Sequence, residues 1–134
     1  SKDIQVSNEI DKNLNVYIDT FLVSTILRNL LSNALKFTKR GGSIKVKAEN
    51  KSNNTIDICV IDNGIGIKAD KLDKIFKLSG SSSQKGTEDE AGTGLGLLVC
   101  KEFAKKNKGD LTVSSEENVG STFILNVLKF KPGE

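Results

Sequence analysis

The segment Leu27–Thr38, with the sequence LRNLLSNALKFT, decides the class of fold because its polar and apolar residues follow a helical period. At roughly 100° per residue, Asn29, Asn33 and Lys36 fall within about 60° of one another and form one polar stripe. Leucine, alanine and phenylalanine fill the neighbouring arc, so this helix is predicted to pack on a core with the stripe at its edge. An amide oxygen at such an edge can coordinate Mg²⁺, and a lysine one turn further can meet a phosphate.

Two glycine clusters of different design follow this helix. In Asp62–Ile67, an aspartate ends an apolar strand and could accept a bond from an amino group, while Gly64 and Gly66 let the backbone turn where a side chain would collide with a ring. The second cluster, Gly92–Leu97, opens a helix whose free backbone amides suit phosphate oxygens. Taken alone, the stripe also fits a solvated helix rim and the clusters fit plain turns. Together they predict a pocket for a nucleotide and its metal.

The remaining sequence predicts an α+β fold, a two-layer sandwich in which a mixed sheet of about five strands packs on three helices. Alternating or apolar runs predict strands at Ile4–Ser7, Leu14–Ile18, Ile44–Ala48, Thr55–Ile61, Leu111–Val113 and Ser121–Val127. Helices are predicted from Asp19 or Thr20 to about Thr38, from Ala69 to Phe76, and from Gly94 to about Asn107. The segment Ser79–Glu90 has no apolar residue, so it is predicted to be a mobile loop.

Composition argues for one domain spanning residues 1–134 and against several classes of function. The chain is 37% hydrophobic and 28% charged, which suits a single core. Its net charge of +3 comes without an arginine-rich block, so no nucleic-acid partner is expected. Cys59 and Cys100 lie in apolar runs and the chain has no histidine, so both are interpreted as buried thiols in a reducing cytoplasm. No apolar run approaches the roughly 20 residues that cross a bilayer, so no membrane contact is expected.

In this order, the motifs resemble those of the catalytic ATP-binding domain of bacterial two-component sensor histidine kinases. That domain belongs to the superfamily of gyrase, heat-shock chaperone, histidine kinase and mismatch-repair ATPases, which have the Bergerat fold. The similarity covers nearly the whole chain: Asn29–Thr38 is similar to the asparagine box, Asp62–Gly66 to the first glycine box, Ile75–Phe76 to the phenylalanine box, Gly92–Gly96 to the second glycine box, and Gly120–Thr122 to the last small box. The chain departs from the family pattern in two places: Lys39 replaces a frequent proline, and Asn107–Gly109 replaces histidine-glycine-glycine.

The resemblance implies that the chain binds ATP and Mg²⁺, with a mobile lid over the nucleotide. Asn33 would hold the metal and Lys36 a phosphate, with Asn29 assisting, and Asp62 would bind the adenine amino group directly and through a water shared with Thr122. Gln84 and Lys85 would contact the γ-phosphate from the lid, although a solvated loop fits them as well. The implied nucleotide-binding residues are Asn29, Asn33, Lys36, Asp62, Gly64, Gly66, Ile67, Phe76, Gln84, Lys85, Gly92, Thr93, Gly94, Leu95, Gly96 and Thr122.

One position separates phosphoryl transfer from hydrolysis. The ATP-hydrolysing relatives carry a water-activating glutamate where this chain has Asn29, and an amide has no useful basicity near neutral pH. The resemblance implies an acceptor histidine on a dimerisation domain, with a response regulator as an indirect partner. The chain contains no histidine, so the acceptor is expected on a separate domain and no residue of the chain is predicted to be catalytic. Two alternatives remain: a catalytically silent nucleotide-binding module that docks on a partner, and a self-contained ATPase.

Overall fold

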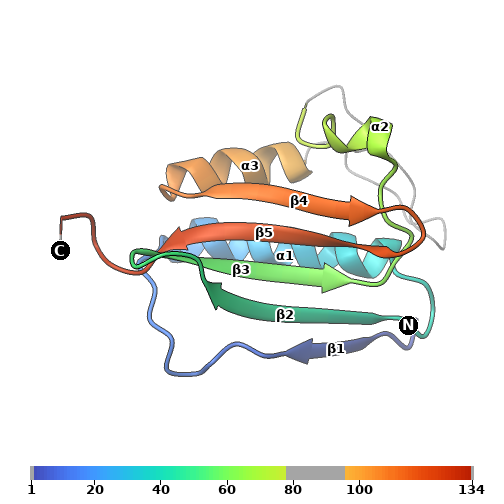
Figure 1. The fold of residues 1–134 in the computed structure, drawn as a ribbon, viewed down its shortest axis with the longest axis horizontal. Coiled ribbons are helices and arrows are strands. Elements are labelled where there is room, and N and C mark those ends of the chain that lie inside the picture. Colours follow the sequence, from blue (N-terminus) through green and yellow to red (C-terminus); the bar gives the residue numbers. More distant parts are fainter. Residues whose placement is uncertain (1, 78–95, 134) are drawn as a thin grey trace.

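The computed structural model describes residues 2–77 and 96–133, and these form one mixed sheet with helices on one face (Figure 1). The strands are β1 (Gln5–Asn8), β2 (Ser43–Asn50), β3 (Thr55–Asp62), β4 (Asp110–Glu116) and β5 (Gly120–Leu128), and the helices are α1 (Thr20–Phe37), α2 (Ala69–Leu72) and α3 (Gly96–Lys106). The strand order is β1-β2-β3-β5-β4, with β1 parallel to β2 and every other neighbour antiparallel. The predicted two-layer α+β fold is therefore confirmed.

Helix α1 supplies one continuous apolar face of the core. The Asp19 carboxylate accepts a hydrogen bond from the Leu22 backbone N–H at 3.0 Å and caps the start of the helix. Buried residues then recur at helical spacing and meet α3 and the sheet in one cluster. Their shared face comprises Val23, Ile26, Leu30 and Ala34. Cys100, on α3, is fully buried in the same cluster, and both cysteines are buried and free, as the sequence predicted.

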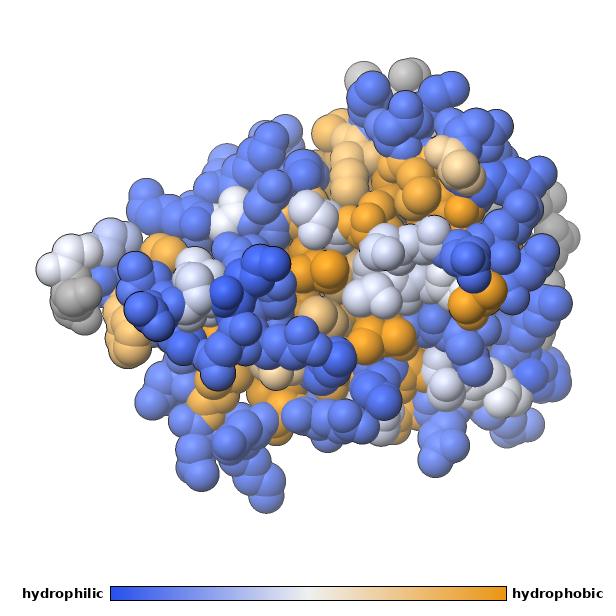
Figure 2. All heavy atoms as spheres, in the orientation of Figure 1, coloured by the Kyte–Doolittle hydropathy of each residue, from blue (hydrophilic) through white to orange (hydrophobic). Residues whose placement is uncertain are grey.

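The central strands β3 and β5 fix the positions of Asp62, at the end of β3, and of Ser121 and Thr122, at the start of β5. Along β5, buried and half-buried residues alternate, because only one face of the sheet meets the helices. The antiparallel register pairs Asp62 with Ser121 and Ile61 with Thr122. Figure 2 views the molecule from the strand side, where apolar surface gathers over the middle of the sheet and hydrophilic residues surround it.

Two predicted elements differ from the structure. Leu14–Ile18 is not a strand; it makes a single bridge, from Tyr17 to Leu128. Its alternating apolar residues Leu14, Val16 and Ile18 pack against the core from an irregular segment, while β1 occupies the sheet edge beside β2. Helix α2 ends at Leu72, short of the predicted Phe76, and Ile75 reaches the core from the turn that follows. No helix within the described ranges has the length and apolar character needed to span a membrane.

Candidate functional site

The polar stripe of α1 lies at the edge of its buried face, as predicted, with Asn29, Asn33 and Lys36 all half-buried. The Asn29 Nδ2 donates a hydrogen bond to the Thr25 carbonyl at 2.9 Å. This bond involves the amide nitrogen and not the Oδ1 acceptor. The Asn33 side chain makes no hydrogen bond with any described residue. The Lys36 ammonium lies 4.8 Å from the centre of the Phe37 ring. Amide oxygens are hard ligands of the kind that Mg²⁺ accepts, so the donor set fits that ion.

The first glycine loop is fastened to the C-terminal end of α1. The Ile65 backbone N–H donates to the Phe37 carbonyl at 3.0 Å. A Cβ added at Gly64 would lie 2.2 Å from that same carbonyl oxygen, so only glycine permits the approach. The helix that carries the amides and the loop that follows β3 are therefore held in one rigid frame.

The other side of the loop is held by the turn between β4 and β5. The Asn118 N–H donates to the Ile65 carbonyl at 2.7 Å, and the Ile67 N–H donates to the Ser115 hydroxyl at 2.8 Å. Gly66 has a φ of +70°, and an added Cβ there would lie 2.1 Å from the Glu116 carbonyl oxygen. The prediction that these glycines make space for a ring is not needed to explain them, because close contacts within the protein already require both.

Asp62 presents a buried carboxylate at the end of β3. Its exposure is only 8%, and its Oδ1 accepts the Gly64 backbone N–H at 2.8 Å. Burial raises the pKa of this carboxyl, and the backbone N–H groups of Gly64 and Ser121 oppose that rise in pKa without cancelling it. The result is a fixed acceptor at low polarity, suited to an amino group of a ligand.

The structure does not bring Thr122 to Asp62. Because Thr122 pairs with Ile61, its side chain lies on the sheet face opposite to that of Asp62. Ser121 pairs with Asp62, is buried at 8% exposure, and shares a 2.7 Å hydroxyl contact with Ser115. The sequence contains a signal for this, since Ser121 is two residues before the apolar Phe123 and therefore lies on the same face of the strand.

Phe76 and Ile67 are half-buried and pack against the core. The Phe76 ring meets the Phe123 ring edge-to-face at 6.4 Å, and the Lys101 ammonium lies 5.0 Å from the Phe76 ring centre. Lys101 also pairs with the Asp110 carboxylate at 2.9 Å and donates to the Leu111 carbonyl at 2.7 Å. Sequence reasoning missed Lys101 because its partners come from distant segments that no local spacing connects.

Six predicted contacts lie outside the described residues: Gln84, Lys85, Gly92, Thr93, Gly94 and Leu95. Gly96 is the first residue of α3, at the helix end where the second glycine cluster was expected to present backbone amides. The site described here therefore consists of the α1 stripe, Asp62 with its loop, and the segment that carries Phe76.

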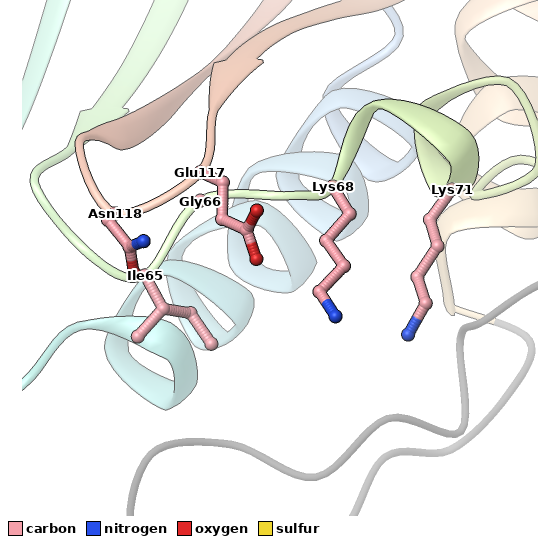
Figure 3. A pocket seen from close by; sticks show the side chains of 6 residues that line it. All are labelled: Ile65, Gly66, Lys68, Lys71, Glu117 and Asn118. Carbon is pink, nitrogen blue, oxygen red and sulfur yellow. The ribbon is translucent and has the colours of Figure 1, made fainter.

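A cavity of about 230 Å³ lies beside the glycine loop (Figure 3). Its lining residues are Ile65, Gly66, Lys68, Lys71, Glu117 and Asn118. Figure 3 shows the Lys68 and Lys71 side chains pointing the same way. Pockets that enclose a drug-sized ligand begin at about 300 Å³. Of the predicted site residues that the structure describes, only Gly66 lines this cavity, and neither Asp62 nor Asn33 contributes to it.

Comparison with known proteins identifies the family. Residues 18–132 match the model of the family described as histidine kinase-, DNA gyrase B-, and HSP90-like ATPases. The chain belongs to this family, because the match covers most of its 134 residues.

The relatives are sensor proteins. The autoinducer 2 sensor kinase/phosphatase LuxQ of Vibrio harveyi is 35% identical over 130 residues, which are 93% of this chain and 15% of LuxQ. The aerobic respiration control sensor protein ArcB of Escherichia coli K12 is 41% identical over 113 residues, 84% of this chain and 14% of ArcB. The chain thus spans a small part of the length of the curated relatives it matches.

A solved structure agrees with the same assignment. The catalytic domain of the histidine kinase ThkA superposes with a TM-score of 0.78 at 25% identity, covering 96% of this chain and 82% of that one. The predicted resemblance to the catalytic ATP-binding domain of sensor histidine kinases is therefore confirmed, and so is the fold that it implied.

Proposed function

We propose that this chain binds Mg-ATP beside α1 and donates the γ-phosphoryl group to a histidine on a separate dimerisation domain of a two-component sensor kinase. The observation that carries the proposal is the hydrogen bond from Ile65 to Phe37. It locks the helix that offers amide oxygens to the loop behind the buried Asp62 carboxylate. A metal-bound triphosphate and an adenine base could therefore be held at once by parts of the protein that do not move relative to one another.

The proposed roles follow from the chemistry of each side chain. Asp62 accepts a hydrogen bond from the adenine amino group, with Ser121 beside it on the same sheet face. Asn33 provides the metal ligand, Asn29 assists at the metal or phosphates, and Lys36 meets a phosphate oxygen as a point charge. When bound, Mg²⁺ neutralises charge on the phosphate oxygens. Residues 84, 85 and 92–95 keep their predicted roles at the phosphates as part of this proposal.

Phosphoryl transfer by this arrangement needs a nucleophile from outside the chain. A histidine nitrogen of the dimerisation domain attacks the γ-phosphorus, a bond from nitrogen to phosphorus forms, and the bond to the β–γ bridging oxygen breaks, releasing ADP. Asn29 has no basicity with which to activate water, so hydrolysis competes poorly. The contribution of the chain is positioning and charge neutralisation. A response regulator in the cytoplasm would then receive the phosphoryl group from the histidine.

Calorimetry tests the binding step. We expect the chain to bind ADP and a nonhydrolysable ATP analogue, with tighter binding when Mg²⁺ is present. Absence of heat at millimolar nucleotide would contradict the proposal.

Two assays separate the remaining alternatives. Supplying the dimerisation domain of the parent kinase with Mg-ATP should label its histidine. Nucleotide binding without that transfer would favour the silent docking module. Steady-state phosphate release from the chain alone, at a rate comparable to its relatives that hydrolyse ATP, would favour the self-contained ATPase.

A further inference from the structure

The ammonium group of Lys2 closes the C-terminal end of α1. Its Nζ donates to the carbonyl oxygens of Leu35 and Lys36, both at 3.0 Å, and of Thr38 at 3.2 Å. The carbonyls at a helix end have no partner within the helix, and they carry the negative end of its dipole. An ammonium has three donors and a positive charge, so the Lys2 side chain both satisfies the free carbonyls and neutralises the negative end of the dipole.

The fourth carbonyl at this helix end accepts a hydrogen bond from the first glycine loop. Phe37 lies between the residues that Lys2 holds, and its carbonyl accepts the Ile65 N–H. Two segments distant in sequence therefore share one helix terminus. One of them is the loop behind Asp62, and the other is the beginning of the chain.

The backbone around Lys2 is fixed as firmly as its ammonium. The Lys2 carbonyl accepts the Gly41 N–H at 2.9 Å, and the Gln5 N–H donates to the Gly42 carbonyl at 3.0 Å. The strand β1 then pairs with β2. In Figure 1 the N-terminus lies beside the start of β2, next to the loop that leaves α1. The backbone that follows the Lys2 Cα is thus anchored, which lowers the entropy lost when the three bonds of the side chain form.

We propose that Lys2 is a positioning residue for Mg-nucleotide binding. The inference rests on the proposed function, because it gives a role to the helix turn that carries Lys36 and, one turn earlier, Asn33. Lys2 holds the carbonyl of Lys36 itself, so its loss frees the last turn to fray. A frayed turn misplaces the phosphate-binding lysine first and the metal ligand next. Displacement of the segment before β1 would also weaken nucleotide binding, because it would move Lys2 away from the end of α1 and let the last turn fray.

The test compares Lys2→Met, which removes the donors and keeps the length of the side chain, with Lys2→Arg, which keeps donors and charge. The matched control is Lys12→Met, because Lys12 is exposed and makes no hydrogen bond or ion pair with any described residue. Two measurements are made on each chain. One is calorimetry with the nonhydrolysable ATP analogue AMPPNP, in Mg²⁺ and in EDTA, and the other is amide hydrogen exchange without nucleotide.

We expect Lys2→Met to weaken AMPPNP binding in Mg²⁺ by about three- to tenfold, in line with the loss of charge-assisted hydrogen bonds at the helix end. Binding in EDTA should weaken less, because Asn33 acts through the metal. Lys2→Arg should retain more affinity than Lys2→Met, and Lys12→Met should match the wild type. Without nucleotide, the amides of the last turn of α1 should exchange faster in Lys2→Met only.

Each other outcome has a distinct meaning. Unchanged AMPPNP affinity in Lys2→Met would overturn the proposal, and so would equal losses with and without Mg²⁺, which indicate general destabilisation. If the wild-type chain binds no nucleotide, the proposed function fails. The exchange measurement then still decides whether Lys2 holds the helix end, because it needs no ligand.

Discussion

Asp62 and Ser121 are register partners on β3 and β5, and both are buried on the sheet face that the helices cover. The carboxylate and the hydroxyl therefore meet at one end of the two central strands, whereas Thr122 lies on the other face. This pairing places the Ser121 hydroxyl beside the carboxylate that we propose as the acceptor for the base. Thr122, which the sequence had suggested for this position, does not contribute to it.

Replacing each hydroxyl in turn tests this arrangement. Ser121→Ala should weaken ADP binding several-fold, because it removes a polar partner beside Asp62 and the contact with Ser115. Thr122→Val should leave ADP affinity within twofold of the wild type, since that side chain lies on the far face. Calorimetry with ADP gives both numbers. The reverse ranking would restore the original assignment of Thr122.

Asn33→Ala should reduce magnesium-dependent nucleotide binding by about tenfold or more, equal to at least about 1.4 kcal/mol. The reason is that the proposed metal ligand is lost while the buried face of α1 stays intact. The measurement is AMPPNP affinity in Mg²⁺ and in EDTA, together with the free energy of unfolding. Ser32→Ala, an exposed neighbour on the same helix, is the control. A parallel loss of binding and stability would make Asn33 a packing residue instead.

Asp62→Asn should erode the preference for adenine over guanine nucleotides. An ionised carboxylate only accepts hydrogen bonds, whereas an amide also donates and can pair with the carbonyl of guanine. Affinities for ADP and GDP, measured for both chains by calorimetry, give the ratio directly. Unchanged selectivity would count against a contact between Asp62 and the base.

The raised pKa of Asp62 also predicts a pH dependence of stability. Its carboxyl is buried, so the folded chain holds the proton to higher pH than the unfolded chain does. The stability contributed by this group is fully present below the unfolded pKa of about 3.9 and declines as pH rises through the raised folded value. Urea unfolding between pH 3 and 7 should show Asp62→Asn gaining on the wild type as pH rises. A constant difference between the two chains would show that the pKa of Asp62 is not raised.

Lys108→Gly should stabilise the fold by about 0.5–1 kcal/mol. A left-handed conformation costs a non-glycine residue about 1–2 kcal/mol, and glycine removes this cost. Part of the gain is lost because glycine has more backbone entropy in the unfolded chain. Lys108 has a φ of +65° after the end of α3, where the Lys108 and Gly109 N–H groups close the helix on Lys105 and Ala104. Urea unfolding measures the change. Asn118→Gly, at a φ of +67°, should gain less because asparagine tolerates this conformation.

The departures from the family pattern show that local sequence patterns do not predict long-range contacts. The sequence predicted only a changed turn at Asn107–Gly109, and a turn is formed there. The structure adds a long-range role, since the Asn107 Oδ1 accepts the Asp19 N–H at 2.7 Å and joins the end of α3 to the start of α1. No spacing in the sequence predicts a contact between residues so far apart. Leu14–Ile18 illustrates the same limit, because an alternating pattern predicts burial on one side but not the partner that a strand needs.

What the sequence determined by itself is what one helix or one turn can encode: the amphipathic helix with its polar stripe, the glycine loop after a buried strand, and the apolar strands of a mixed sheet. Periodicity and backbone freedom are local properties, so they can be read from neighbouring residues. The tertiary structure alone decided that Lys2 closes α1, that Lys101 holds Phe76, and that Asp62 faces Ser121. These relations depend on strand register and on which segments meet in space, because burial and charge pairing act between residues that the chain brings together only on folding.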